Sequence, residues 1–428
     1  MTRMKDSGIE WIGEVPEEWG VKPIKHIFGA IGSGTTPDSS KVEYYDGNIN
    51  WLQSGDLYKK DYVYAVSKTI TDLGYRSSAS LRIYQAPFLA IAMYGASIGN
   101  LAISKIDACV NQAVVVLKGE ENIVRFAKLA LEISKTELIF AAQGGTQPNV
   151  NQVLIKNWVI PFPSEVEIKK IADFLDKKVA QLDKVKSLLE EQIKILEDYR
   201  QSLIYETVTK GLDKTAPLKD SGVDWIGQIP EGWGIGRLKD FVKFQTGTTP
   251  PQSIGVNQDE SGVPWFKPGD FSDNSIDLLS SENHITHEVV MQYNLSVYPK
   301  KTILLVGIAS IGKVGYSAQP SYSNQQITAL RTIGEIYPRY LAYLMFSSGR
   351  FIKETALYTV VPIINNQYLA TMRLVLPSEN KQKIIVEYLD RKLEQINQMI
   401  AIKKEQIENI NKQRQTLIYD YVTGKRRV

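Results

Sequence analysis

The chain has 428 residues, 43% of them hydrophobic, which predicts two to three domains with ordinary cores and excludes a disordered chain. Lys and Arg number 50 against 47 Asp and Glu, a weaker basic excess than a protein that binds nucleic acid alone usually has. The single cysteine, Cys109, excludes an internal disulfide, and no stretch approaches the roughly 18 apolar residues of a membrane span. The start, MTRMKDSGIEWIG, has no signal-peptide pattern, so we expect a cytoplasmic protein with no membrane partner.

The first distinctive segment is KDSGIEWIGEVPEEWG at 5–20, which returns as KDSGVDWIGQIPEGWG at 219–234. Between 5–25 and 219–239, 12 of 21 positions are identical at an offset of 214, half the chain length. Further segments repeat in the same order: GTTP at 34–37 and 247–250, ASIG at 96–99 and 309–312, Asn111-Gln112 and Asn324-Gln325, LIYETVT at 203–209 and LIYDYVT at 417–423. A single repeat of this period predicts two duplicated domains, because solenoids need about three or more short units.

Each half begins with a mixed region, roughly 20–160 and 235–375, that carries short β-rich runs and turns rich in Gly, Pro and Ser. Helical patches are expected near 121–142 and 336–353. The opening segment itself predicts either a structural belt that packs the domain against a helix or a docking surface for a partner protein.

Each half then ends in a long helical stretch without Gly or Pro, about 165–209 and 379–422. The first has a heptad repeat of apolar residues, with Ile171, Val185 and Tyr199 on companion positions; the second is patchier and is interrupted at Lys403. Two long helices could pack on domain surfaces or on each other, and we favour mutual packing. The predicted pairing residues are Leu175, Leu182, Leu189, Leu196, Leu389, Ile396 and Ile410.

The direction of the helices follows from the domain between them. The second mixed region joins the end of the first helix to the start of the second, and domain termini usually lie close together, so the helices should run antiparallel. We therefore predict an α+β fold: two pseudo-repeated mixed α/β domains separated by two long antiparallel helices that form a coiled coil. The expected bounds are 1–164, 165–210, 211–378 and 379–428.

The sequence contains no recognisable catalytic constellation. Gly307-x-x-x-x-Gly312-Lys313 resembles a phosphate-binding loop, but Val314 stands where Ser or Thr is needed, so a strand-to-strand turn is favoured. His284 and His287 could begin a metal site, yet no cysteine or second histidine pair accompanies them. We expect no metal, no cofactor on this chain, and a binding role rather than an enzymatic one.

Turns rich in Ser, Thr, Gly and Gln, with scattered Lys, Arg and Tyr, suit contacts to phosphates and base edges. Each could also be ordinary polar surface. Shared motifs match between the halves while 58–85 and 272–298 have little in common, a pattern typical of one frame with two different reading surfaces. The candidate DNA contacts are Ser33, Thr35, Thr36, Lys59, Lys60, Arg76, Tyr94, Ser97, Gln143, Thr146, Gln147, Thr248, Thr249, Lys267, Ser310, Lys313 and Tyr358.

These motifs together resemble the specificity subunit of type I restriction-modification enzymes over essentially the whole chain: SGIEWIGEVPEEW and SGVDWIGQIPEGW, GTTP, the YGASIG-type turn, a Pro-Ser strand end feeding a long helix, and LIYETVTKG and LIYDYVTGK. The resemblance implies two target recognition domains, each reading half of a bipartite double-stranded DNA sequence. It implies helices that set the spacer and dock two methyltransferase subunits carrying S-adenosylmethionine, with a motor-nuclease restriction subunit joining for cleavage.

Two other classes stay open. One is a single-chain enzyme whose site is not visible in the sequence. The other is a structural coiled-coil adaptor without DNA readout, which sequence-dependent DNA binding would exclude.

Overall fold

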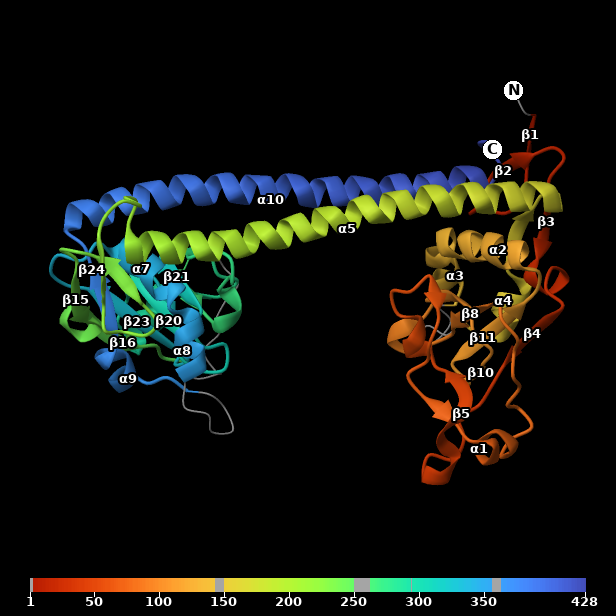
Figure 1. Ribbon diagram of the computed structural model, residues 1–428, viewed down its shortest axis with the longest axis horizontal. Coiled ribbons are helices and arrows are strands. Elements are labelled where there is room, and N and C mark those ends of the chain that lie inside the picture. Colours follow the sequence, from red (N-terminus) through yellow and green to blue (C-terminus); the bar gives the residue numbers. More distant parts are fainter. Residues whose placement is uncertain (1–2, 143–149, 250–261, 294, 356–362) are drawn as a thin grey trace. The chain divides into compact units, whose positions relative to one another are not determined.

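The computed structural model describes residues 3–142, 150–249, 262–293, 295–355 and 363–428. The chain divides into two compact units, Met1–Leu188 with Glu405–Val428 (unit 1) and Leu189–Lys404 (unit 2). Both long helices, α5 (Glu165–Lys210) and α10 (Glu379–Val422), contribute to both units (Figure 1). No helix in the described ranges is long and apolar enough to cross a membrane.

Unit 1 is built on a five-stranded sheet of order β4-β11-β8-β9-β6, antiparallel except for the β6–β9 pair. The apolar runs FLAIA and VVVLK form its central strands, whose residues are buried on both faces. Its strands are β4 (Ala30–Ser33), β11 (Val114–Lys118), β8 (Phe88–Ala92), β9 (Leu101–Ser104) and β6 (Tyr62–Val63).

Among its described residues, unit 1 also has three smaller sheets and four short helices. The three-stranded sheet β10-β5-β7 carries the buried Trp51, and α2 packs on β8 and β9. The smaller-sheet strands are β10 (Cys109–Val110), β5 (Tyr45–Leu52), β7 (Thr69–Ile70), β12 (Val159–Phe162) with β3 (Gly20–Pro23), and β1 (Met4–Asp6) with β2 (Glu14–Pro16). The helices are α1 (Asp72–Arg76), α2 (Glu121–Ile133), α3 (Lys135–Ala141) and α4 (Gln152–Asn157), with 3-10 turns η1 (Ile24–His26), η2 (Val42–Tyr44), η3 (Ser54–Leu57) and η4 (Gly95–Ser97).

Unit 2 repeats this topology strand for strand, which confirms the predicted duplication of the fold. Its main sheet has the order β16-β23-β20-β21-β18: β16 (Val242–Thr246), β23 (Ile327–Thr332), β20 (Thr302–Val306), β21 (Val314–Ser317) and β18 (Asp277–Leu278). The smaller sheets are β19 (His284–Ile285), β17 (Val263–Phe266) and β22 (Tyr322–Ser323); β15 (Gly234–Arg237) and β24 (Arg373–Leu376); β13 (Leu218–Asp220) and β14 (Gln228–Pro230). Its helices are α6 (His287–Gln292), α7 (Pro338–Ser347), α8 (Gly349–Thr355) and α9 (Asn366–Thr371), with η5 (Leu238–Asp240) and η6 (Pro268–Asp270).

The helices α5 and α10 run antiparallel inside each unit, as predicted. In unit 1 the Phe174 and Tyr421 rings lie 4.6 Å apart and Asp183 pairs with Arg414. In unit 2 Lys403 Nζ donates to Gln192 Oε1 over 2.6 Å. The lysine that interrupts the apolar repeat thus bonds across the helix pair.

The seven predicted pairing residues differ in burial. Leu175, Leu389 and Ile396 are buried in the unit cores, and Leu196 packs partly buried against the core of unit 2. Leu182, Leu189 and Ile410 are only partly buried. The apolar packing is therefore concentrated where each helix pair meets a domain.

Of the three companion positions of the heptad, Ile171 is buried in the core of unit 1 as predicted, but the two later ones were assigned to the wrong side of α5. Val185 is 47% exposed and Tyr199 52% exposed. Ile193 and Arg200, four residues after Leu189 and Leu196, lie inward instead. The sequence pattern missed this because a polar side chain, Arg200, occupies a position where apolar periodicity expects a hydrophobic one.

Both opening segments pack on helix ends, which confirms the structural-belt interpretation. In unit 1, Trp19 lies in the core with Ile418 and Val422 of α10, and in unit 2, Trp233 lies with Val208 of α5. The Tyr419 hydroxyl donates to the Ile12 carbonyl at 3.1 Å. Its counterpart 214 residues earlier, Tyr205, donates to the Ile226 carbonyl at 3.0 Å.

Candidate nucleic-acid interface

The GTTP turns place two threonines of each unit on the surface beside the main sheet. The exposed Thr36 hydroxyl donates to Gln112 Oε1 at 2.6 Å, and the Thr249 hydroxyl makes the same bond to Gln325 Oε1. Ser33, by contrast, ends β4 and donates to the Val114 carbonyl at 2.8 Å. Its hydroxyl is committed to the sheet.

A buried tryptophan hydrogen-bonds to the backbone of each GTTP turn. The Trp51 indole N–H donates to the Thr35 carbonyl at 3.2 Å, and the Trp265 indole N–H donates to the Thr248 carbonyl at 3.2 Å. A Cβ on Gly34 would lie 1.8 Å from the Val110 carbonyl oxygen, so only glycine allows the turn to approach that strand.

The lysine pair after η3 lies at the rim of a small pocket of about 190 Å³ in unit 1. Lys59 has a left-handed backbone, with φ of 53°, and its ammonium lies 5.2 Å from the Tyr58 ring centre. Lys60 is exposed beside it, and Lys135 lines the same pocket and donates to Asn100 at 3.0 Å. Burial lowers the pKa of Lys135 against the attraction of Glu132.

The other unit 1 candidates are spread over separate turns. Arg76 is exposed at the end of α1, Tyr94 is partly exposed, and Ser97 lies in η4. Gln143, Thr146 and Gln147, together with Tyr358 of the second half, lie outside the described residues.

In unit 2 the segment 307–313 is a turn between the antiparallel strands β20 and β21, with no helix following it. The alternative of a phosphate-binding loop is therefore wrong, since that loop opens a helix. Lys313 donates to the Phe271 carbonyl at 3.2 Å and pairs with Asp273 at 3.1 Å. With the exposed Ser310 it lines a pocket of about 500 Å³.

Lys267 lies on the tryptophan that holds the second GTTP turn. Its ammonium is 4.9 Å from the Trp265 ring centre and donates to Asn283 Oδ1 at 2.9 Å. In each unit, candidates thus gather around the GTTP turn and around a pocket, while Arg76, Tyr94 and Ser97 lie on other turns of unit 1.

Within the described ranges, no group of three or more His, Cys, Asp and Glu residues is placed to hold a metal ion. His284 is buried as a residue of the sheet strand β19.

The model of the type I restriction modification DNA specificity domain matches this chain twice, over residues 16–196 and 230–411. The chain belongs to this family. Each match runs through one mixed region and into the long helix that follows it.

Relatives of the specificity-domain family match the chain over almost its full length. The chain is 24% identical to the type I restriction enzyme MjaIX specificity subunit of Methanocaldococcus jannaschii, over 97% of this chain and 95% of the relative. A solved chain of a type I restriction-modification system aligns with a TM-score of 0.74 at 16% identity, covering 95% of this chain and 98% of that one. The HsdS subunit from Thermoanaerobacter tengcongensis aligns with a TM-score of 0.52 at 18% identity, covering 96% and 98%. These structures share the fold.

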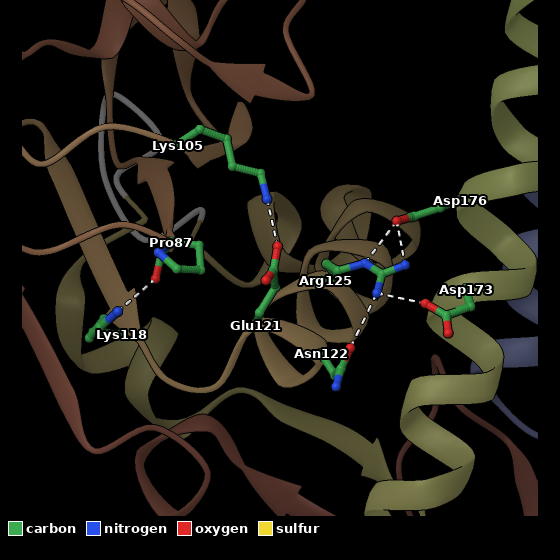
Figure 2. A network of polar contacts seen from close by, with 8 residues as sticks. All are labelled: Pro87, Lys105, Lys118, Glu121, Asn122, Arg125, Asp173 and Asp176. Atoms are coloured by element: carbon green, nitrogen blue, oxygen red, sulfur yellow. Dashed lines mark hydrogen bonds and ion pairs between the residues drawn. The ribbon is translucent and has the colours of Figure 1, made fainter.

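Sequence reasoning missed the arginines that fasten each specificity domain to a long helix. Arg125 of α2 reaches Asp173 at 2.8 Å and Asp176 at 2.7 Å on α5 (Figure 2). In unit 2, Arg339 of α7 bonds Asp390 of α10 at 2.9 Å. The signal was available, because Arg125 and Asp176 recur 214 residues later as Arg339 and Asp390.

A second group of charged residues in unit 1 joins the loop after η3 to α2 and α10. Lys128 of α2 pairs with Asp61 and with Glu132, and Glu132 pairs with Arg414 of α10. Burial acts to raise the pKa of Asp61, but the charge and hydrogen bond of Lys128 outweigh it, so the pKa is lowered. This group holds the lysine pair at 59–60 in place, since Asp61 follows it directly.

Proposed function

We propose that this chain is the DNA sequence-specificity subunit of a type I restriction-modification complex, and that each unit reads one half of a bipartite double-stranded target. The observation that carries the proposal is that the same fold occurs twice in the chain, with different segments inserted in each copy. The two units have the same strand order, yet 58–85 and 272–298 have little in common. Membership of the specificity-domain family and the similarity to the MjaIX specificity subunit support it.

The proposed DNA contacts are the exposed members of the candidate set, chiefly Lys59, Lys60, Arg76, Lys267 and Ser310. Their side chains suit phosphate and base-edge contacts. An excess of three basic residues is small for a protein that binds DNA alone. We therefore expect partner subunits to share the phosphate contacts, with a steep salt dependence for the complex.

The long helices are proposed to dock two methyltransferase subunits and to set the unspecified spacer between half-sites. Four apolar residues on α5 are exposed by about half: Val185, Leu188, Ile195 and Tyr199. Val185 and Leu188 of unit 1 are three residues apart and Ile195 and Tyr199 of unit 2 are four apart, so each pair shares a helix face that the α5–α10 contacts in its unit leave open. Such exposed apolar pairs suit a partner helix.

On this proposal the chain performs no bond chemistry. S-adenosylmethionine would bind the methyltransferase subunits, which would transfer its methyl group to adenine, and restriction subunits would join for cleavage. The chain would decide only where this chemistry occurs.

Sequencing of methylated adenine in cells that carry the cognate methyltransferase, with and without this chain, tests the proposal. The expected result is a chain-dependent motif of two unlike short blocks around a fixed gap. Absence of chain-dependent methylation would contradict it and favour the adaptor. The double substitution Ile195→Lys with Tyr199→Lys should abolish co-purification of the methyltransferase, whereas the control Lys194→Glu, at an exposed position outside both apolar pairs, should not.

A further inference from the structure

We infer that the Thr36–Gln112 and Thr249–Gln325 pairs are matched, sequence-independent contacts to the DNA backbone, with each glutamine amide N–H group donating to a phosphate oxygen. This inference rests on the proposed function. The glutamines were not among the candidates chosen from the sequence.

Each pair fixes the orientation of an exposed amide. The threonine hydroxyl donates to Oε1 of its glutamine, so the planar amide must direct Nε2 away from the threonine. Among the described residues, neither Gln112 Nε2 nor Gln325 Nε2 donates a hydrogen bond to another protein atom. Two oriented N–H groups are therefore presented outward in each unit.

A role in stability alone does not account for the pairs. The turn is already held by the buried indole bonds of Trp51 and Trp265 and by the close approach of Gly34 to Val110. A hydrogen bond between two exposed side chains adds little to this, because water competes for both groups. What the pair does supply is preorganisation of a donor, which lowers the entropy lost on binding.

The repetition of the pair decides between phosphate and base. Both residues and the bond between them recur at an offset of 213, inside two units whose insertions differ. A base-reading glutamine in both units would impose the same base on both half-sites. A phosphate accepts the same contact in any sequence and fixes the register of the protein on the duplex.

The neighbouring charge also favours an anionic partner in unit 2. Lys267 lies over Trp265, the residue that holds Thr248 beside the pair. Unit 1 has Gln53 at the equivalent position, so the cation is not part of the shared frame.

The test is equilibrium binding of the full-length chain, assembled with its cognate methyltransferase subunits, to a cognate duplex and to one with both half-sites scrambled. Gln112→Met and Gln325→Met should each weaken binding about tenfold, as expected for one hydrogen bond to a charged group. The loss should be the same on both duplexes. The slope of log K against log salt should not change, because a neutral donor releases no counterion.

Gln112→Glu should weaken binding further, since it brings a negative charge to a phosphate. The control Gln228→Glu adds the same charge at an exposed position of β14, outside the proposed DNA and methyltransferase contacts, and should leave binding within about twofold. A duplex with a neutral methylphosphonate at the contacted position should make wild type and Gln112→Met bind equally. Thermal unfolding of every variant establishes that the fold is kept.

Two outcomes overturn the inference while the proposed function stands. Wild-type affinity in Gln112→Met and Gln325→Met would leave the pairs a structural tie only. A loss confined to the cognate duplex, or a changed methylation motif, would make them base readers. If the wild-type complex itself does not discriminate cognate from scrambled DNA, the proposed function and the inference both fail.

Discussion

Arg414 in unit 1 and Arg200 in unit 2 occupy equivalent positions 214 residues apart, on opposite helices of the pair, yet their surroundings differ. Arg414 pairs with Glu132 and with Asp183 at 3.3 Å. Arg200, 3% exposed, donates to Asn274 and to Asn397 at 3.2 Å, and its Nε finds no acceptor among the described residues. Burial lowers the pKa of Arg200, with Glu197 opposing it, whereas around Arg414 the effect of burial is outweighed by Glu132 and Asp183 and the pKa is raised.

The difference shows that the two units share a backbone fold but not the charges that surround the equivalent arginines. Asp183 and its counterpart Asn397 take equivalent places against the two arginines, and a carboxylate became an amide, or the reverse. Each unit therefore has its own electrostatic support under the same backbone.

The largest expected effect comes from removing these two arginines. Arg414→Met should cost about 3 kcal/mol of unfolding free energy, because Asp183 loses its ion pair and Glu132 keeps only Lys128 as a cation. Arg200→Met should cost about 1 kcal/mol or less, since only neutral amides lose a partner. Hydrogen exchange of the α2 and α7 peptides reports each unit separately. Equal losses in the two units would contradict the comparison.

Removing the two shared anchors should instead give equal effects. Arg125→Ala and Arg339→Ala should each destabilise their unit by about 2 kcal/mol, because each frees two partly exposed carboxylates, on α5 in unit 1 and on α10 and β18 in unit 2. Urea denaturation with double-mutant cycles to Asp176 and Asp390 measures the coupling in each unit. A coupling present in one unit only would mean that the anchors are not equivalent.

Much of the fold was predictable from the repeat, and the reasons for the remaining errors are physical. The buried strands and the long helices follow from apolar runs and periodicity. The inward position of Arg200 did not, because periodicity treats arginine as a surface residue. The Lys128–Asp61 pair joins residues that are 67 apart in the sequence. The second half of the chain has no Lys–Asp pair at the corresponding positions, so the repeat did not indicate this contact. Lys59, Arg76 and Ser310 were predicted from residue type alone. The structure shows that they are exposed, but it does not define what they bind.

A smaller, pH-dependent effect is expected from Asp61 in unit 1. Its pKa is lowered in the folded chain because Lys128 outweighs burial, so the ionised form stabilises the fold above the unfolded pKa of about 3.9. This contribution is lost as the pH falls through the folded pKa. Between pH 5 and 3, unfolding free energy should fall more steeply in wild type than in Asp61→Asn. The double variant with Lys128→Met should have the same slope as Asp61→Asn; a wild-type slope in both would remove Asp61 from the account.

The smallest effect concerns two buried groups at equivalent positions, Cys109 in β10 and Tyr322 in β22. Burial raises the pKa of each to about 12. At pH 8 the native Cys109 thiol should react with Ellman's reagent on the order of a hundredfold more slowly than in guanidinium, because little thiolate is present. Fast native labelling would show that the β10 strand opens readily.

The central claim, that each unit reads one half-site, is tested most directly by transplanting the recognition region of one unit. Residues 30–157, from the start of β4 to the end of α4, would be replaced by the corresponding segment of a family member with a different target, and methylated adenine would be sequenced genome-wide. The account predicts that one block of the motif changes while the other block and the gap stay the same. A change in both blocks, or in neither with methylation intact, would contradict it.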